Sequence, residues 1–325
     1  MKRSPARPRH DASDFIAARA RPESASGPKD AEAAVLAELR PGQSVELLKA
    51  LHILTRDGRL NQDSRRKLKQ VDHLVQFIEK IVAETTPHAG ELTLADHGAG
   101  KSYLGFILYD LLLKGQGSGM VYGIETRAEL VERSRALAER LGFERMRFLN
   151  IAAADAAQDA DLPARIDVVT ALHACDTATD DAIAFGLAKH AQALVLVPCC
   201  QAELAASLRQ HKALQLSRTP LAELWRHPLH TREMGSQLTN VLRCLYLESQ
   251  GYSVTVTELV GWEHSLKNEL IIARHTGHKK RSAGERLRAL LGQFGLQTLL
   301  PLRYPALAAS AAPAPESIVQ EVDPS

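Results

Sequence analysis

The chain has 325 residues, of which 45% are hydrophobic and 24% charged, which is typical of a globular protein with one large domain or two small ones. Its formal net charge of +2 is too small to predict a nucleic-acid partner without a local basic cluster. No apolar run reaches the roughly 18 residues of a membrane span, and residues 1–28 lack the apolar core of a signal peptide. Four cysteines, two of them adjacent, do not form a disulfide framework, so we expect a cytoplasmic protein without a membrane partner.

The first 84 residues are expected to contain a leader and a helical region. Residues 1–30 show no apolar period and predict a disordered, mildly basic leader. Residues 31–84 predict helices, the longest from Gln62 to Glu84, because apolar residues recur there at helical spacing. Near its start lie four basic residues, Arg65, Arg66, Lys67 and Lys69. They are either a solvated helix start or a contact for substrate phosphates.

Residues 85–280 alternate between strand and helix patterns, which predicts an α/β fold with a mostly parallel sheet. The last two strands are joined by too short a connection for a crossover helix, so they should pair antiparallel. A helix is expected within residues 281–303, and a disordered low-complexity tail over residues 304–325. The expected strands are Leu92–Asp96, Met120–Glu125, Met146–Ile151, Ile166–Leu172, Ala193–Val197, Tyr252–Val260 and Glu269–Arg274.

A glycine turn follows the first expected strand, in the order Asp96, His97, Gly98, Ala99, Gly100. Glycine lets the backbone press against a ligand where the chain turns from strand into helix. A dinucleotide fingerprint would need a third glycine at Tyr103, so that class of site is not predicted. Glu125 ends the second strand, where a carboxylate can hold both hydroxyls of a ribose. Turn and acid together predict a nucleoside site, although the turn alone could be only a tight connection.

This pattern resembles motif I and the ribose-binding acid of class I S-adenosylmethionine methyltransferases, with Ser102 in place of a usual third glycine. The terminal antiparallel hairpin is also typical of that class. The resemblance implies a Rossmann-like, seven-stranded sheet with an N-terminal helical extension, and S-adenosylmethionine as cofactor. Asp155 is the expected adenine contact, with an exposed loop carboxylate as the alternative, and Leu172 should lie near the sulfonium. The implied cofactor-binding residues are Asp96, Gly98, Gly100, Glu125, Asp155 and Leu172.

Two further segments follow the fourth and fifth strands, LHACDTATD at residues 172–180 and VPCC at residues 197–200. Because ligands bind beyond the carboxyl ends of parallel strands, both segments should border one cleft. They look like segments of the methyltransferase-domain family that includes tRNA 2′-O-methyltransferases, methyltransferase-like proteins and glutathione-S-transferase C-terminal-domain-containing proteins. The resemblance runs from about Lys67 to Arg274 and departs from the family at Asp176, where a glycine is common.

That resemblance implies methyl transfer to an oxygen or nitrogen atom, with RNA as the acceptor. A hydroxyl acceptor would profit from a base, and His173 or Asp176 could take its proton. For His173 the alternative is a structural histidine whose ring nitrogens are hydrogen-bonded in the fold. Asp180 is expected to cap or brace the helix that follows.

Other functions remain open at this point. Cys175, with Cys199 or Cys200, would suit a cysteine-dependent RNA cytosine-5 methyltransferase, but the Pro-Cys pair expected on strand four is absent. A zinc site lacks a C-x-x-C pair, so no metal is predicted, and the cysteines could instead only fill space. A protein acceptor and a catalytically silent cofactor-binding scaffold are the remaining hypotheses. The sequence does not predict an oligomeric state.

Overall fold

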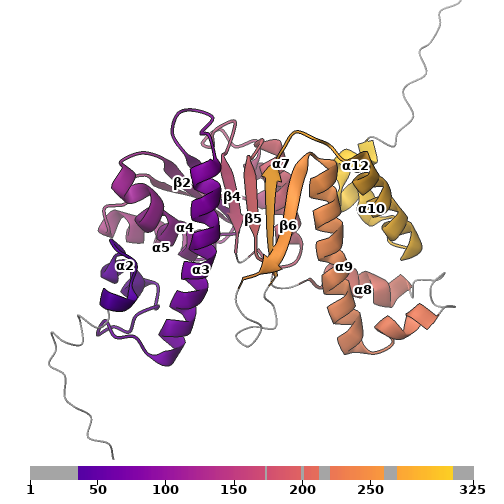
Figure 1. Ribbon diagram of the computed structural model, residues 1–325, viewed down its shortest axis with the longest axis horizontal. Coiled ribbons are helices and arrows are strands. Elements are labelled where there is room, and N and C mark those ends of the chain that lie inside the picture. Colours follow the sequence, from indigo (N-terminus) through magenta and orange to yellow (C-terminus); the bar gives the residue numbers. More distant parts are fainter. Residues whose placement is uncertain (1–35, 173, 199–200, 212–219, 260–268, 310–325) are drawn as a thin grey trace, which may run out of the picture. The chain divides into compact units, whose positions relative to one another are not determined.

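The structure is a computed structural model that describes residues 36–172, 174–198, 201–211, 220–259 and 269–309. The chain divides into two compact units, residues 1–40 and residues 41–325, and the fold described below belongs to the second. The predicted leader at residues 1–30 lies outside the described residues, as does most of the predicted tail. Figure 1 labels the elements along the chain.

A seven-stranded sheet in the order β3-β2-β1-β4-β5-β7-β6 forms the centre of the fold. Its strands are β1 Thr93–His97, β2 Met120–Glu125, β3 Met146–Asn150, β4 Val168–Ala171, β5 Ala193–Leu196, β6 Tyr252–Glu258 and β7 Glu269–His275. Neighbouring strands among β1 to β5 pair in parallel, and β7 is antiparallel to both β5 and β6. The predicted mostly parallel sheet with a terminal antiparallel hairpin is confirmed. Because Leu196 pairs with Ile271, β7 starts at the edge where the parallel strands end.

The helices follow the predicted alternation with the strands. They are α2 Val45–Ala50, α3 Gln62–Glu84, α4 Tyr103–Leu108 continued by η2 Tyr109–Leu113 and η3 Lys114–Gln116, α5 Ala128–Arg140, α6 Ala153–Ala156, α7 Thr177–Ala188, α8 Glu203–His211, η5 Pro220–Trp225, α9 Pro228–Ser249, α10 Arg281–Gln293, α11 Leu299–Arg303 and α12 Pro305–Ala309. Helix α3 has the predicted bounds, and the side chain of Asn61 caps it by accepting the N–H of Ser64. None of the helices in the described ranges is long and apolar enough to cross a membrane.

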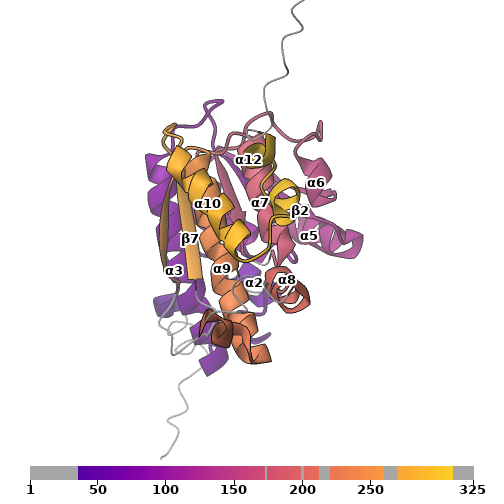
Figure 2. The ribbon, with the colours of Figure 1, turned by 90° about the vertical axis from the view of Figure 1, so that its right-hand side faces the viewer.

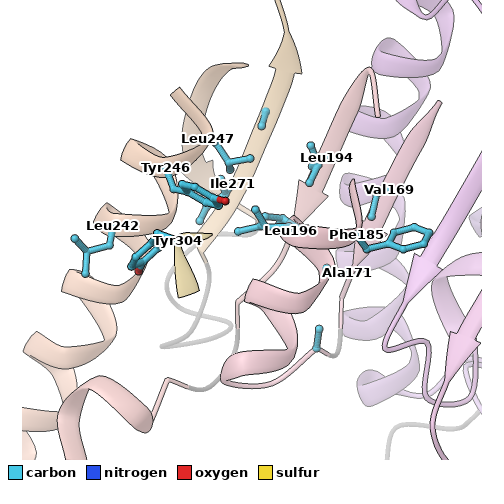
Figure 3. Close-up of a cluster of buried hydrophobic side chains, with 14 of the residues drawn as sticks. Val169, Ala171, Phe185, Leu194, Leu196, Leu242, Tyr246, Leu247, Ile271 and Tyr304 are labelled. Atoms are coloured by element: carbon cyan, nitrogen blue, oxygen red, sulfur yellow. The ribbon is translucent and has the colours of Figure 1, made fainter. Parts of the chain in front are cut away.

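Helices cover both faces of the sheet. On one face, Phe106 of α4 packs against Phe148 of β3, with ring centroids 5.4 Å apart. On the other face, a buried cluster joins α7, α9 and α10 to β4, β5 and β7, as Figure 3 shows for its central side chains. Within it the rings of Tyr246 and Tyr304 meet with centroids 5.2 Å apart. Helices α9 and α10 lie side by side in Figure 2, and α9 also contacts β6, the edge strand next to β7.

The structure corrects the predicted C-terminal boundary. The sequence predicts one helix within residues 281–303 and a disordered tail from residue 304, whereas α10 ends at Gln293 and α12 occupies Pro305–Ala309. Tyr304 and Leu307 are buried, and they belong to the cluster that α9 and α10 complete. Tertiary burial therefore orders a segment whose local composition predicts a tail. Residues 310–325 lie outside the described residues.

A buried carboxylate fastens the edge of the sheet where the parallel strands begin. Asp167, fully buried just before β4, accepts hydrogen bonds from the N–H groups of His88 and Thr93 at 2.9 and 2.8 Å. The hydroxyl of Thr93 and the side-chain amide of Gln192 also donate to it. One carboxylate thus joins the segment before β1, the start of β4 and the start of β5.

Candidate functional site

The predicted glycine turn lies directly after β1, at the edge where the parallel strands end. Gly98 and Gly100 have φ angles of +64° and +59°, a region that favours glycine. The N–H of Ala99 donates to the carbonyl of Ile124 at 3.0 Å and fixes the turn against β2. A Cβ added at Gly100 would meet, within 4 Å, only the guanidinium of Arg127 at 3.8 Å. Among the described residues, Gly100 is therefore open except for one flexible side chain, whereas a Cβ at Gly98 would meet the Cβ of Ala174 at 3.2 Å.

Glu125 points toward this turn from the end of β2. Its Oε2 accepts the N–H of Gly100 at 2.7 Å, and its Oε1 accepts the N–H of Arg127 at 3.0 Å. The guanidinium of Arg127 donates to both carboxylate oxygens, at 3.0 and 3.1 Å. Burial alone would raise the pKa of Glu125, but the hydrogen bonds from Arg127 and Gly100 outweigh it and lower the pKa to about 2. A charged carboxylate is thus fixed beside Gly100 at the end of β2.

Asp96 lies beneath the turn rather than on its open side. The side chain is 2% exposed, and it accepts the N–H of Gly105 at 3.2 Å and the hydroxyl of Thr170 at 3.0 Å. Burial raises its pKa to about 6, although both hydrogen bonds act to lower it. Asp96 therefore joins β1, β4 and the first turn of α4, and it supports the glycine turn from behind.

His97, the next residue, is a buried histidine that sequence reasoning did not single out. It is 2% exposed, and neither ring nitrogen has a hydrogen-bond partner among the described residues. Its ring lies 5.5 Å from that of Phe185 on α7. Burial lowers its pKa to about 4, against the charge of Glu125, which acts to raise it. The imidazole is therefore neutral at pH 7.

The remaining predicted cofactor contacts differ in their surroundings. Leu172 follows β4 and is half-buried, at the same edge as the glycine turn. Asp155 lies in α6 and is exposed. Asn150, at the end of β3, donates to the carbonyls of Glu125 and Thr126 at 3.1 and 2.8 Å. The structure thus brings Leu172 to the site edge, leaves Asp155 on the surface, and adds Asn150 as a residue that fixes the loop after Glu125.

The predicted catalytic pair is only half described. His173 lies outside the described residues. Asp176 has φ +54° and ψ −122°, a strained conformation for a residue with a side chain. Its Oδ1 accepts the N–H groups of Ala202 and Glu203, at 2.9 and 3.2 Å, at the start of α8. Asp176 therefore joins the turn after β4 to the segment after β5.

A buried arginine holds the same turn from α9. Arg243 is fully buried and donates to both oxygens of Asp180, at 3.0 and 2.6 Å. It also donates to the backbone carbonyl of Asp176 at 2.7 Å and to the side-chain oxygen of Asn240 at 3.1 Å. Asp180 thus braces α7 through Arg243, and α9 is tied to the turn after β4. Neither the charge nor the spacing of Arg243 in the sequence indicates this contact.

The cysteines give no metal site within the described part of the chain. Cys175 is exposed, while Cys199 and Cys200 lie outside the described residues. Among the described residues, no group of three or more His, Cys, Asp or Glu side chains could hold a metal ion. Cys244 on α9 is half-buried, and burial raises the pKa of its thiol to about 12, which keeps it protonated.

The basic cluster at the start of α3 is partly neutralised. Arg66 and Lys67 both pair with Asp63, at 2.6 and 2.8 Å. Lys69 is exposed one turn further along the helix. Surface pairs of this kind contribute little to stability, but they reduce the charge that the cluster can offer to a phosphate.

One protein-family model matches part of this chain. Residues 66–207 match the model of a methyltransferase-domain family. Among solved structures, a magnesium protoporphyrin IX methyltransferase from Synechocystis PCC 6803 with bound S-adenosylhomocysteine is 15% identical, with 72% of this chain and 95% of that chain covered and a TM-score of 0.41. An rRNA methylase from Streptococcus thermophilus is 11% identical, with 62% and 95% covered and a TM-score of 0.37. TrmK from M. capricolum in complex with S-adenosylhomocysteine is 10% identical, with 72% and 92% covered and a TM-score of 0.37. The comparison with curated proteins finds no match.

Proposed function

The chain carries a class I S-adenosylmethionine-dependent methyltransferase domain, and from this premise we propose that it methylates an oxygen or nitrogen atom of RNA in the cytoplasm. The observation that supports the cofactor site is the 2.7 Å hydrogen bond between Gly100 and Glu125, which places a charged carboxylate beside an open glycine turn. We place the domain at residues 85–280, behind the N-terminal helices.

The residues at this edge fit the cofactor. A ribose offers two hydroxyl donors, and Glu125 offers two carboxylate oxygens that the low pKa keeps charged. The backbone of Gly100 allows close approach because it has no Cβ, and Gly98 lets the turn pack against Ala174. When bound, S-adenosylmethionine supplies a methyl group activated by its sulfonium.

The chain's own contribution to methyl transfer is mainly alignment. Holding the acceptor atom in line with the methyl group removes much of the entropic barrier, and little covalent help is needed. Leu172 and the turn to Asp176 follow β4 at the site edge, so they are suited to border the acceptor. Because Oδ1 of Asp176 already accepts two backbone N–H groups, we assign Asp176 to positioning this turn and keep His173 as the proposed base for a hydroxyl acceptor.

The resemblance of residues 172–180 and 197–200 to RNA-methylating relatives supports RNA as the acceptor. The exposed cations Lys69 and Lys101 also support it, since RNA affinity comes largely from phosphate contacts. Lys101 directly follows Gly100 and is therefore close to the cofactor site.

The test combines calorimetry with S-adenosylmethionine and a tritiated-methyl transfer assay on total RNA and total protein. We expect binding, and label in the RNA pool. Glu125→Gln should weaken cofactor binding by about tenfold or more, since it removes a charged acceptor for two hydroxyls. Glu129→Gln is the matched control, because Glu129 is an exposed acid in the first turn of α5.

The alternatives predict different results in the same assay. Label in protein alone would replace RNA with a protein acceptor, and binding without transfer to either pool would favour a scaffold. Label in RNA that disappears when Cys175, Cys199 or Cys200 is changed to Ala would favour cytosine-5 chemistry. A chain that does not bind S-adenosylmethionine would overturn the whole proposal.

A further inference from the structure

A cavity of about 460 Å³ lies beside the cofactor turn and is not part of it. It is formed by the end of α2, the start of α4 and one side of α5. Its lining residues are Ala50, Leu51, His52, Lys101, Tyr103, Leu130, Arg133, Ser134, Ala136, Leu137 and Arg140. The volume is within the range of small-molecule sites. The lining combines leucine and tyrosine side chains with the cationic or imidazole groups of His52, Lys101, Arg133 and Arg140.

The charge of this cavity is one-sided. No Asp or Glu is among the lining residues that the structure describes. Arg140 is 3.7 Å from Glu46, which is itself 64% exposed, so this pair is weak. Asp72 is not among the lining residues. Burial raises the pKa of Tyr103, and the negative charge of Asp72 raises it further. Lys101 and Arg133 are exposed and have no ion-pair partner within the described chain, so their charges remain available to an anion.

The backbone at His52 supplies an independent observation. His52 follows α2 in a Schellman motif, in which the N–H of Ile53 donates to the carbonyl of Leu48 and the N–H of His52 donates to that of Lys49. The residue at this position has a positive φ, here +57°, and glycine is strongly preferred. Helix α5 follows that preference with Gly142. His52 therefore places an imidazole on the wall of the cavity at a position that glycine usually occupies, and the same backbone recurs at His190, which is not among the lining residues.

We propose that this cavity binds one nucleotide of an RNA substrate, with its phosphate on Lys101 and Arg133 and its base against Tyr103 and the leucines. Arginine and lysine side chains are the usual phosphate contacts, and an aromatic ring is the usual partner of an unstacked base. The proposal rests on RNA being the acceptor. It adds a contact beside the cofactor turn that would hold the RNA while an adjacent nucleotide enters the site.

The first test uses the full chain, with 5′-CMP, cytidine and inorganic phosphate as probes in calorimetry. We expect 5′-CMP to bind more tightly than either part alone. Arg133→Ala should weaken 5′-CMP binding about tenfold, and it should lower the slope of log affinity against log salt for a short single-stranded RNA by about 0.7. S-adenosylmethionine affinity should not change. Arg281→Ala, which removes a 93% exposed charge on α10, is the control that should change neither.

The second test separates structure from binding. His52→Gly should raise the melting temperature by about 2 °C, because it relieves the positive φ, and yet weaken RNA binding. His190 is the matched control, since it occupies the same position after α7 with φ +52° and is not among the lining residues. His190→Gly should raise the melting temperature similarly and leave RNA affinity unchanged.

The outcomes are distinguishable from those of the proposed function. Label in RNA together with wild-type 5′-CMP and RNA binding by Arg133→Ala and His52→Gly would overturn the cavity proposal and leave RNA methylation intact. Label only in protein would overturn RNA as the acceptor and, with it, an RNA nucleotide as the occupant of the cavity, whatever the 5′-CMP affinity of Arg133→Ala. Equal RNA affinity of His52→Gly and His190→Gly would remove His52 from the site.

Discussion

Asp96 and His97 are adjacent buried groups whose contributions to pH-dependent stability have opposite signs. The pKa of Asp96 rises from 3.8 to about 6 in the folded chain, so its contribution is full below pH 3.8 and is lost as pH rises through about 6. The pKa of His97 falls from 6.5 to about 4, so its contribution is full above pH 6.5 and is lost as pH falls through about 4. At about 1.4 kcal/mol for each pKa unit, either contribution amounts to about 3 kcal/mol. In the wild-type chain the contribution of Asp96 falls between pH 4 and pH 6.5 while that of His97 rises, so the sum of the two changes little with pH.

Single substitutions should separate these contributions. Asp96→Asn keeps both partners of the carboxylate, since its amide oxygen can accept from Gly105 and its NH₂ can donate to Thr170. In that variant only His97 still titrates as a buried group. Wild type loses the contribution of Asp96 as pH rises, so the stability of the variant relative to wild type should increase by about 3 kcal/mol from pH 4 to pH 6.5. His97→Leu removes the imidazole, whose stabilising contribution grows as pH rises, so the stability of this variant relative to wild type should decrease by about 3 kcal/mol over the same interval.

Urea unfolding between pH 4 and pH 7.5 measures both effects as differences from wild type. Asp57→Asn, an exposed loop substitution, should follow the wild-type profile. The reasoning is refuted if the two variants show parallel profiles, because neither residue would then titrate as a buried group. A changed m-value in either variant would point instead to altered compactness.

Three further predictions concern single side chains. Ser102 has φ +51° and a buried hydroxyl without a hydrogen-bond partner among the described residues. Ser102→Gly should therefore raise the free energy of unfolding by about 1 kcal/mol in urea titrations, and a lower free energy would contradict the strain argument. Asp167→Ala should lower the free energy of unfolding by about 3 kcal/mol or more, because four hydrogen-bond donors lose a buried carboxylate. A change below about 1 kcal/mol would show that water replaces the carboxylate. Arg127→Ala should tighten S-adenosylmethionine binding about threefold in calorimetry, because the guanidinium occupies the two Glu125 oxygens that would bind the ribose hydroxyls. Weaker binding would show that Arg127 contacts the ligand instead.

The strand and helix pattern of the sequence predicts most of the sheet because apolar spacing is a local property. The bounds of α3 follow from its apolar stripe and from Asn61 as its cap. The approach of Glu125 to Gly100 is also predictable, because β1 and β2 are parallel neighbours and end at one edge. Residues that alternate along a strand face opposite sides, so the separation of Asp96 from His97 could have been foreseen as well.

Contacts between distant segments could not be predicted in this way. Arg243 is a charged residue that the composition of α9 would place in solvent, yet it is fully buried against Asp180, which lies 63 residues earlier. Asp176 accepts N–H groups 26 and 27 residues away. Tyr304 is buried in a cluster in which its ring meets that of Tyr246, 58 residues earlier on α9. None of these partners is visible from propensity or spacing, since each depends on how complete elements pack.

The carboxylate of Asp176 also limits how this chain can change during evolution. It satisfies two backbone donors of α8 and holds a backbone conformation that glycine would adopt more easily. A descendant with a different segment after β5 would lose those donors, and the aspartate would keep its strain without a partner. A related chain whose segment after β5 no longer offers these donors should therefore carry glycine at position 176.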